Sequence, residues 1–200
     1  MEIRDKNFTE YKKKTLMKLA SAYDRNEVDS LVIPLLTYIN QLSGYVTTSS
    51  CSGRIIVMEL PSVGDKKNAI FHGKFHSVVT VDDINESILK YSKGQLWFIS
   101  QSPIFHIAAA SLDLADILVK KGVSAGFKHS GFKTINDRII VELCSTERMD
   151  VPLGLDGTII IQNNYINHLI SHANDLIKRG QSKLKRLETT LNSRNNVEEK

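Results

Sequence analysis

The chain has 200 residues, of which 42% are hydrophobic and 24% charged, so it can form a globular core and is not disordered throughout. Its 26 basic and 22 acidic residues leave a net charge of +4, a mild excess. No apolar run reaches the ~20 residues that span a bilayer, the first residues lack the apolar stretch of a signal peptide, and two cysteines are too few for a disulfide framework. A cytoplasmic protein with no membrane association is therefore expected.

The first half of the chain begins with helical patterns and then changes to strand-like ones. The predicted elements are, in chain order, a helix over 7–24, a helix after Asp29 or Ser30, strands over 45–50, 54–60 and 71–81, and a short helix ending at Lys90. Asp29 or Ser30 can cap the second helix, and Asp83 with Glu86 has the spacing of a capping box. The strands on either side of Cys51-Ser52-Gly53 predict a hairpin or a tight corner.

The second half of the chain continues this mixture. Its predicted elements are strands over 95–101 and 104–110, a helix from Ser111 stopped by Gly122, strands over 126–132, 138–144 and 158–162, and a helix from Tyr165 to the high 180s. From about residue 178 the last helix has few apolar residues among basic ones, so this part is expected to pack incompletely on the core. The pattern predicts one α+β domain over 1–200, with a mainly antiparallel or mixed sheet, two N-terminal helices, inserted short helices and a long C-terminal helix.

Basic residues gather in two places that bear on possible partners. They are Lys12, Lys13, Lys14 and Lys18 near the start, and Lys178, Arg179, Lys183, Lys185, Arg186 and Arg194 near the end. Such clusters favour a polyanion because binding releases counterions, and two solvated helix faces are the alternative interpretation.

Several familiar signatures are missing. The sequence has no G-x-G-x-x-G between a strand and a helix, no Walker A motif and no H-E-x-x-H. His168 and His172 have the i, i+4 spacing of metal ligands, but no third ligand accompanies them, so no metal site is predicted. A non-Rossmann fold is expected, and any nucleotide-like cofactor must be held in another way.

The densest polar feature is the run Thr47-Thr48-Ser49-Ser50-Cys51-Ser52-Gly53-Arg54, with five hydroxyls, a thiol, a glycine and a guanidinium. Successive backbone N–H groups can form an anion nest, and Arg54 can hold a carboxylate or phosphate with two hydrogen bonds. The alternative is a polar hairpin with Arg54 in solvent. Cys51 is expected to be a small packed side chain rather than a nucleophile.

Two further segments combine polar groups with apolar strands. In the run from Trp97 to Ile107, His106 lies among apolar neighbours and is either a hydrogen-bonded core residue or a proton acceptor. The run Gly126-Phe127-Lys128-His129-Ser130-Gly131 is either a bent strand end or a second wall of an anion-binding pocket.

Together these segments resemble the wybutosine-synthesising protein 3 family. The motifs that carry the resemblance are Thr48–Arg54, Phe98–Ile107, Gly126–Gly131, Ser145-Thr146 leading to Val151-Pro152-Leu153, and Ala173-Asn174. The resemblance covers most of the chain. It implies an S-adenosylmethionine-dependent methyltransferase that is not built on the Rossmann fold. Its substrate would be the 7-(3-amino-3-carboxypropyl)-4-demethylwyosine base at position 37 in the anticodon loop of phenylalanine tRNA, methylated at N4.

The resemblance also indicates which residues form the site. His106 is the expected proton acceptor, because a neutral imidazole suits proton transfer near pH 7. The residues expected to bind the cofactor or the substrate are Ser49, Ser50, Cys51, Ser52, Gly53, Arg54, Gly126, Phe127, Lys128, Ser130 and Gly131. Ile99, Gln101 and Ser102 depart from the family pattern, so they supply no carboxylate ahead of the histidine.

The RNA backbone is expected to contact the basic end of the chain. The residues concerned are Lys178, Arg179, Lys183, Lys185 and Arg186. The competing hypothesis is a non-catalytic RNA-binding module of tRNA modification, and a weaker one is an enzyme that uses Cys51 as a nucleophile with His106.

Overall fold

The computed structural model describes residues 7–193, so Arg194 of the basic cluster lies outside the described residues. Contacts divide the chain into two compact units, each assembled from separate stretches. The first comprises the stretch up to Ser52, Pro103–Thr146 and the stretch from Gln181, and the second comprises Gly53–Ser102 and Glu147–Gly180. One domain over the whole chain stays a prediction.

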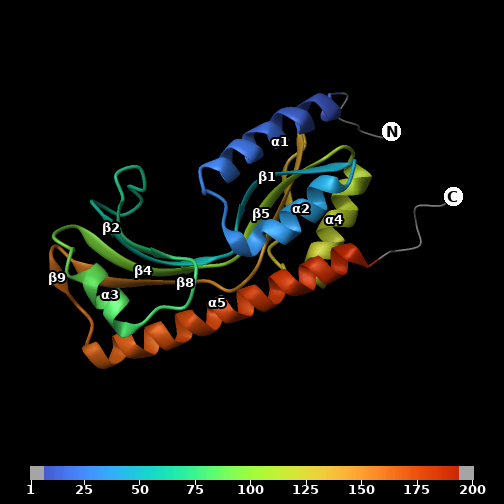
Figure 1. The fold of residues 1–200 in the computed structure, drawn as a ribbon. Helices are drawn as coiled ribbons and strands as arrows, with labels where there is room; N and C mark the ends of the chain where they lie inside the picture. The colour runs from blue at the N-terminus through green and yellow to red at the C-terminus, as the bar shows by residue number, and fades with distance from the viewer. Residues whose placement is uncertain (1–6, 194–200) are drawn as a thin grey trace. The chain divides into compact units, whose positions relative to one another are not determined.

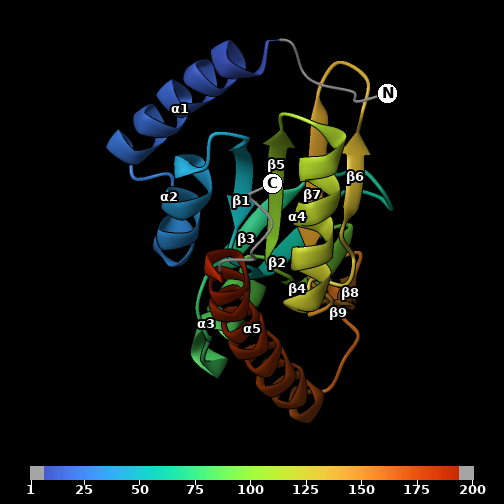
Figure 2. The same cartoon turned by 90° about the vertical axis from the view of Figure 1, so that its right-hand side faces the viewer.

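The first unit is built on a four-stranded antiparallel sheet of order β1-β5-β7-β6. Its strands are β1 (Tyr45–Cys51), β5 (Ile104–Ala109), β6 (Gly131–Thr134) and β7 (Ile139–Cys144). Its helices are α1 (Phe8–Asp24), the 3₁₀ helix η1 (Ser30–Val32), α2 (Ile33–Gln41), α4 (Leu112–Ser124) and the end of α5 (Asn163–Asn192). Figure 2 shows α4 lying over β7.

The two faces of this sheet differ in what covers them. Because strand residues alternate between faces, Phe105 and Ile107 point to one side, where α2, α4 and the end of α5 complete the main core. Ala108 and Val46 point to the other side, where Phe8 of α1 packs on them. Helix α1 covers only part of this second face, and it leaves His106 partly exposed.

The second unit is a five-stranded antiparallel sheet of order β3-β2-β4-β8-β9. Its strands are β2 (Arg54–Leu60), β3 (Ile70–Phe75), β4 (Gln95–Gln101), β8 (Met149–Leu155) and β9 (Thr158–Ile159). The short helix α3 (Val81–Ile88) and the first part of α5 bury one face, through residues such as Ile84 and Ala173 (Figure 1).

The predicted fold class is confirmed. The structure is α+β, every strand pairing within residues 7–193 is antiparallel, and there is no parallel Rossmann sheet in this part of the chain. No helix of the described residues is both long and apolar enough to cross a membrane.

Several local predictions are wrong, each for a physical reason. Of the two alternatives expected at Cys51-Ser52-Gly53, the hairpin does not form, since β1 and β2 belong to different sheets. The tight corner is the alternative that holds, with Gly53 at φ +91°. Helix α4 passes through Gly122, which is buried because Leu143 packs where a side chain would be, and it ends at Ser124. The capping box of α3 is formed by Thr80 and Asp83 rather than by the predicted pair.

The end of α5 also differs from the expectation of incomplete packing. Leu184, Leu187 and Leu191 are buried in the main core of the first unit. Three buried leucines on one side of the helix are enough to hold it, although basic residues surround them in the sequence.

Candidate active site

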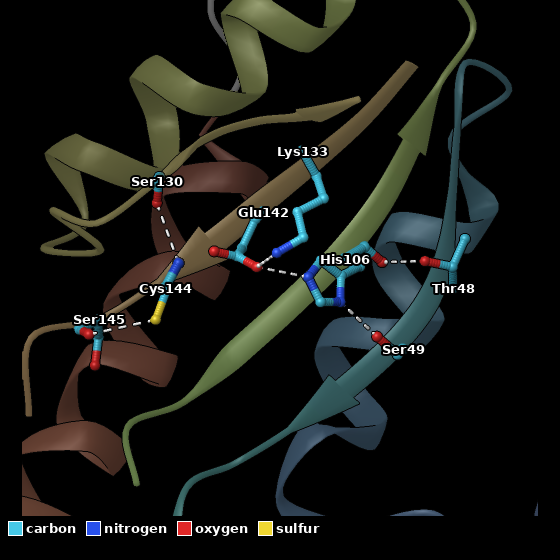
Figure 3. A network of polar contacts seen from close by, with 8 residues as sticks. All are labelled: Thr48, Ser49, His106, Ser130, Lys133, Glu142, Cys144 and Ser145. Carbon is cyan, nitrogen blue, oxygen red and sulfur yellow. Dashed lines mark hydrogen bonds and ion pairs between the residues drawn. The ribbon is translucent and has the colours of Figure 1, made fainter. Parts of the chain in front are cut away.

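The four-stranded sheet places the predicted proton acceptor in a row of polar residues. Across the strands, Ser49 of β1 lies opposite His106 of β5, which lies opposite Glu142 of β7, which lies opposite Gly131 of β6. The row therefore joins all three segments that the sequence singled out. Figure 3 shows the side chains of Ser49, His106 and Glu142 on neighbouring strands. They lie on the face that α1 covers only in part.

The row is a continuous chain of hydrogen bonds. Ser49 Oγ lies 2.7 Å from His106 Nδ1, and His106 Nε2 lies 2.7 Å from Glu142 Oε2. Lys133 Nζ donates to the same carboxylate oxygen at 3.1 Å, and Thr48 donates its hydroxyl to the His106 carbonyl at 3.1 Å. The side chains of His106 and Glu142 are each 26% exposed, so a substrate can reach them.

The ionised carboxylate of Glu142 sets the direction of the hydrogen bonds in this chain. The hydrogen bond from His106 holds the pKa of Glu142 below its usual range, with Lys133 adding to the effect against partial burial. As an anion, Glu142 only accepts, so His106 donates from Nε2. In the neutral imidazole Nδ1 is then the acceptor, and the Ser49 hydroxyl donates to it.

A second row lies two residues further along the strands on the same face. It consists of Cys51, Ile104 and Cys144, all half-buried. Neither cysteine forms a disulfide, and a whole strand, β5, separates them. The row is an apolar, polarisable surface beside the hydrogen-bonded chain.

The arrangement can accept a proton from a weakly acidic N–H or O–H group placed on this face. A neutral imidazole whose orientation a carboxylate fixes is a suitable general base near pH 7. Cys51 is not paired with this base, since its partner across the strands is Ile104 and His106 contacts Ser49. The hypothesis of a Cys51–His106 nucleophile therefore has no support in the geometry.

Comparison with known proteins identifies the chemistry. The family model described as "Methyltransferase TYW3" matches residues 10–193. The chain belongs to the TYW3 methyltransferase family. It is a methyltransferase, so the predicted family and enzyme class are confirmed, and a non-catalytic module is excluded.

Named relatives and solved structures agree with this assignment. A Pyrococcus horikoshii protein named tRNA(Phe) 7-((3-amino-3-carboxypropyl)-4-demethylwyosine(37)-N(4))-methyltransferase 1 is 50% identical over 94% of this chain and 97% of its own. A protein of the same name from Pyrococcus furiosus is 48% identical over the same shares. The structure of the PH1069 protein from Pyrococcus horikoshii superposes with a TM-score of 0.90 at 49% identity, covering 94% of this chain and 97% of that one.

The TYW3 motif from Ser49 to Arg54 does not form one cluster, because its residues alternate in direction. Ser50 lies opposite Phe105, whose side chain belongs to the core, so Ser50 and Ser49 point to opposite faces. Ser52 is buried, and both its backbone N–H and its hydroxyl donate to Asp29. Asp29 also caps η1 by accepting from Leu31 N, so it ties the end of β1 to the start of the second helix.

Arg54 begins the second unit. It is half-buried on β2, and its Nε donates to Gln101 Oε1 at 2.7 Å. This contact orients the guanidinium. Within residues 7–193 its two terminal nitrogens have no side-chain or backbone acceptor, so both can bind a ligand. The predicted alternative of a fully solvated Arg54 is therefore wrong.

The segment Gly126–Gly131 contributes less than predicted. Phe127 is fully buried and packs edge-on against Phe105, so it is a core residue. Ser130 Oγ donates to Phe127 O at 2.5 Å and accepts from Cys144 N at 3.3 Å, which closes the loop. Lys128 is exposed, and Gly131 alone reaches the polar row. Gly126, at φ +101°, lies against Lys183 and Arg186.

The basic residues of α5 are not equivalent. Lys178, Arg179, Lys185 and Arg186 are exposed. Lys183 is only 9% exposed, and its Nζ donates to Thr146 Oγ1 at 3.1 Å, so it is not a surface site for RNA phosphates as predicted.

Sequence reasoning missed Glu142 and Lys133. Glu142 is the single acidic residue in an otherwise apolar strand pattern from Ile139 to Cys144, and that irregularity was the available signal. Lys133 carried no signal, because it reaches Glu142 only through the pairing of β6 with β7. Within residues 7–193 no group of three His, Cys, Asp or Glu side chains could hold a metal ion.

Proposed function

We propose that this protein methylates N4 of the 7-(3-amino-3-carboxypropyl)-4-demethylwyosine base at position 37 of phenylalanine tRNA, with S-adenosylmethionine as methyl donor. The observation that carries the proposal is the Ser49–His106–Glu142 chain, in a protein 50% identical to a relative named for this reaction. The reaction is expected to take place in the cytoplasm, where tRNA is modified.

Methylation of a ring N–H requires removal of its proton. S-adenosylmethionine supplies an electrophilic methyl group, so an N–C bond forms while the S–C bond breaks and its electron pair stays on sulfur. Ser49 Oγ takes the ring proton as it passes its own to His106 Nδ1, and Glu142 balances the imidazolium that results. The imidazolium of His106 then releases the proton to solvent, since His106 is partly exposed.

The residues present suit this donor by their chemistry. A carboxylate such as that of a methionine moiety needs a cation, and Arg54 offers two terminal nitrogens on a guanidinium that Gln101 orients. In the first unit, taken by itself, half-buried Cys51, Ile104 and Cys144 form an apolar surface next to the Ser49–His106–Glu142 row.

The open sheet face suits an unpaired nucleotide. A base in an anticodon loop is already single-stranded, so it can be turned out of the loop at small cost and laid against a protein surface. An open sheet face that carries a proton acceptor suits an unpaired planar base better than a base inside a duplex.

The test is methyl transfer to phenylalanine tRNA that carries the precursor base. Wild-type protein with S-adenosylmethionine is expected to methylate this tRNA, and His106→Gln is expected to lose about 10²-fold or more in kcat while still binding the donor. Arg54→Ala is expected to weaken donor binding in calorimetry about 10- to 100-fold. A wild-type protein that neither binds the donor nor modifies the tRNA would contradict the proposal.

A further inference from the structure

Helix α1 forms one border of the open face that carries the polar row. Phe8 is buried against Val46 and Ala108. Ala108 lies two residues from His106 on β5, so the helix covers the row of the sheet next to the Ser49–His106–Glu142 row. Helix α1 makes a second contact through Tyr11, whose ring centre lies 4.8 Å from the guanidinium of Arg138. Arg138 directly precedes β7, so the start of that strand lies against the same helix.

The outer surface of α1 is basic. Lys13, Lys14 and Lys18 are exposed, and Lys14 has only a distant, exposed partner in Glu10 at 3.7 Å. Lys12 is different, since its Nζ donates to Leu42 O at 2.5 Å and burial lowers its pKa. Three lysines are therefore available to phosphates at the edge of the site.

The basic end of α5 lies on the other side of the sheet. Leu184, Leu187 and Leu191 pack in the core beneath Phe105 and Ile107, which point away from the polar row. Lys185 and Arg186 are exposed on this helix, so roughly a helix diameter of ~10 Å and the sheet itself separate them from the row. Phosphates next to a base held at His106 are thus closer to α1.

We propose that tRNA docks its backbone on α1, through Lys13, Lys14 and Lys18, and not on the basic end of α5. This proposal rests on tRNA being the substrate, and it places the RNA backbone on the other of the two basic clusters, in place of the expected contact with the end of α5. The lysines attract phosphates without reading sequence, and the open sheet face receives the modified base.

The experiment compares two charge-matched variants of the full-length protein. Lys13→Gln with Lys18→Gln removes two exposed charges from α1, and Lys185→Gln with Arg186→Gln removes two from α5. Binding of phenylalanine tRNA bearing the precursor base is measured at several salt concentrations, together with KM for that tRNA and binding of S-adenosylmethionine. Circular dichroism checks that each variant is folded.

The α1 variant is expected to raise KM for tRNA roughly three- to tenfold. It is also expected to lower the salt slope by about 1.5, with donor binding unchanged. The α5 variant is expected to match the wild type. An impaired α5 variant beside a normal α1 variant would overturn the docking surface, as would two normal variants. A wild type with no activity on this tRNA would instead overturn the proposed function.

Discussion

At the scale of single residues, Glu142 is the group that gives His106 its role. Its carboxylate accepts from Nε2, and this leaves Nδ1 as the acceptor next to Ser49. Without that anion both tautomers of the imidazole become accessible, and the one with a proton on Nδ1 cannot accept another there. Glu142 therefore acts on the reaction through His106.

Glu142→Gln is expected to lower kcat about 10²-fold, because the amide no longer selects one tautomer. KM for tRNA and binding of the methyl donor are expected to stay near wild type, since Glu142 touches neither in the proposed reaction. Steady-state kinetics and calorimetry check this. Lys133→Gln is the matched control, since it removes the other partner of the carboxylate and is expected to cost much less. Equal losses in both variants would mean that charge balance, not tautomer selection, matters.

At the scale of elements, the sequence predicted the kinds of secondary structure better than their partners. The helix over 7–24 and the strands over 95–101 and 104–110 agree with α1, β4 and β5, because local periodicity determines them. At Cys51–Gly53 the sequence left a hairpin and a tight corner open, and the structure has the corner, since a residue with positive φ serves equally to send the chain into another sheet.

In the candidate site, too, the sequence predicted single residues better than the contacts between them. His106 and Ser49 were predicted as functional, but their contact depends on the pairing of β1 with β5, which spans more than fifty residues of chain and leaves no local pattern. Ser50 and Phe127 were assigned to the site with their neighbours, although alternation and burial place them in or toward the core. The family resemblance marks the whole motif, and a motif alone does not show which of its side chains face the core.

The contribution of the end of helix α5 to stability can be tested by removing one of its buried side chains. Leu187 is fully buried in the first unit, so Leu187→Ala is expected to lower the free energy of unfolding by about 2–5 kcal/mol through lost burial and a cavity. Chemical denaturation followed by circular dichroism measures this. Ile135→Ala, at a site 49% exposed in the same unit, is the control and is expected to change stability little. A Leu187 variant as stable as the control would mean that the end of the helix is a dispensable tail.

At the scale of the whole molecule, the two units are not independent pieces of sequence. The chain leaves one unit for the other after Ser52, Ser102, Thr146 and Gly180. Each unit also keeps one partly buried or buried carboxylate in contact with a histidine. These pairs are His106–Glu142 in the first unit and His72–Glu59 in the second. Only the first pair faces an accessible surface, so the second serves stability.

Glu59 links three parts of the second unit. Its side chain is 2% exposed, its Oε2 lies 3.0 Å from His72 Nε2, and it accepts from Ser92 N at 3.1 Å. Burial alone would raise the pKa of Glu59, but hydrogen bonds from His72 and from the backbone at Ser92 and Lys93 outweigh it and lower the pKa. A lowered pKa means that folding favours the anion, so this stabilisation is complete above the ordinary glutamate pKa of about 4.3. It is lost as the pH falls through the still lower folded value.

The expected result is that Glu59→Gln lowers the stability of the second unit at pH 7 by about 1–3 kcal/mol, since the hydrogen bonds that the buried carboxylate accepts from His72 and the backbone are weakened or lost. The same variant is expected to reduce the further loss of stability on acidification. Trp97, the single tryptophan, lies on β4 next to Met58 of β2, so its fluorescence reports on the unfolding of the second unit. The measurement is urea unfolding followed by this fluorescence, at pH 7 and below about pH 4.3. Glu86→Gln, an exposed change in the same unit, is the control and is expected to follow the wild type at both values. If Glu59→Gln follows it too, the hydrogen bonds of the neutral amide replace those of the carboxylate, and the buried anion is not what holds β2, β3 and the turn at Ser92 together.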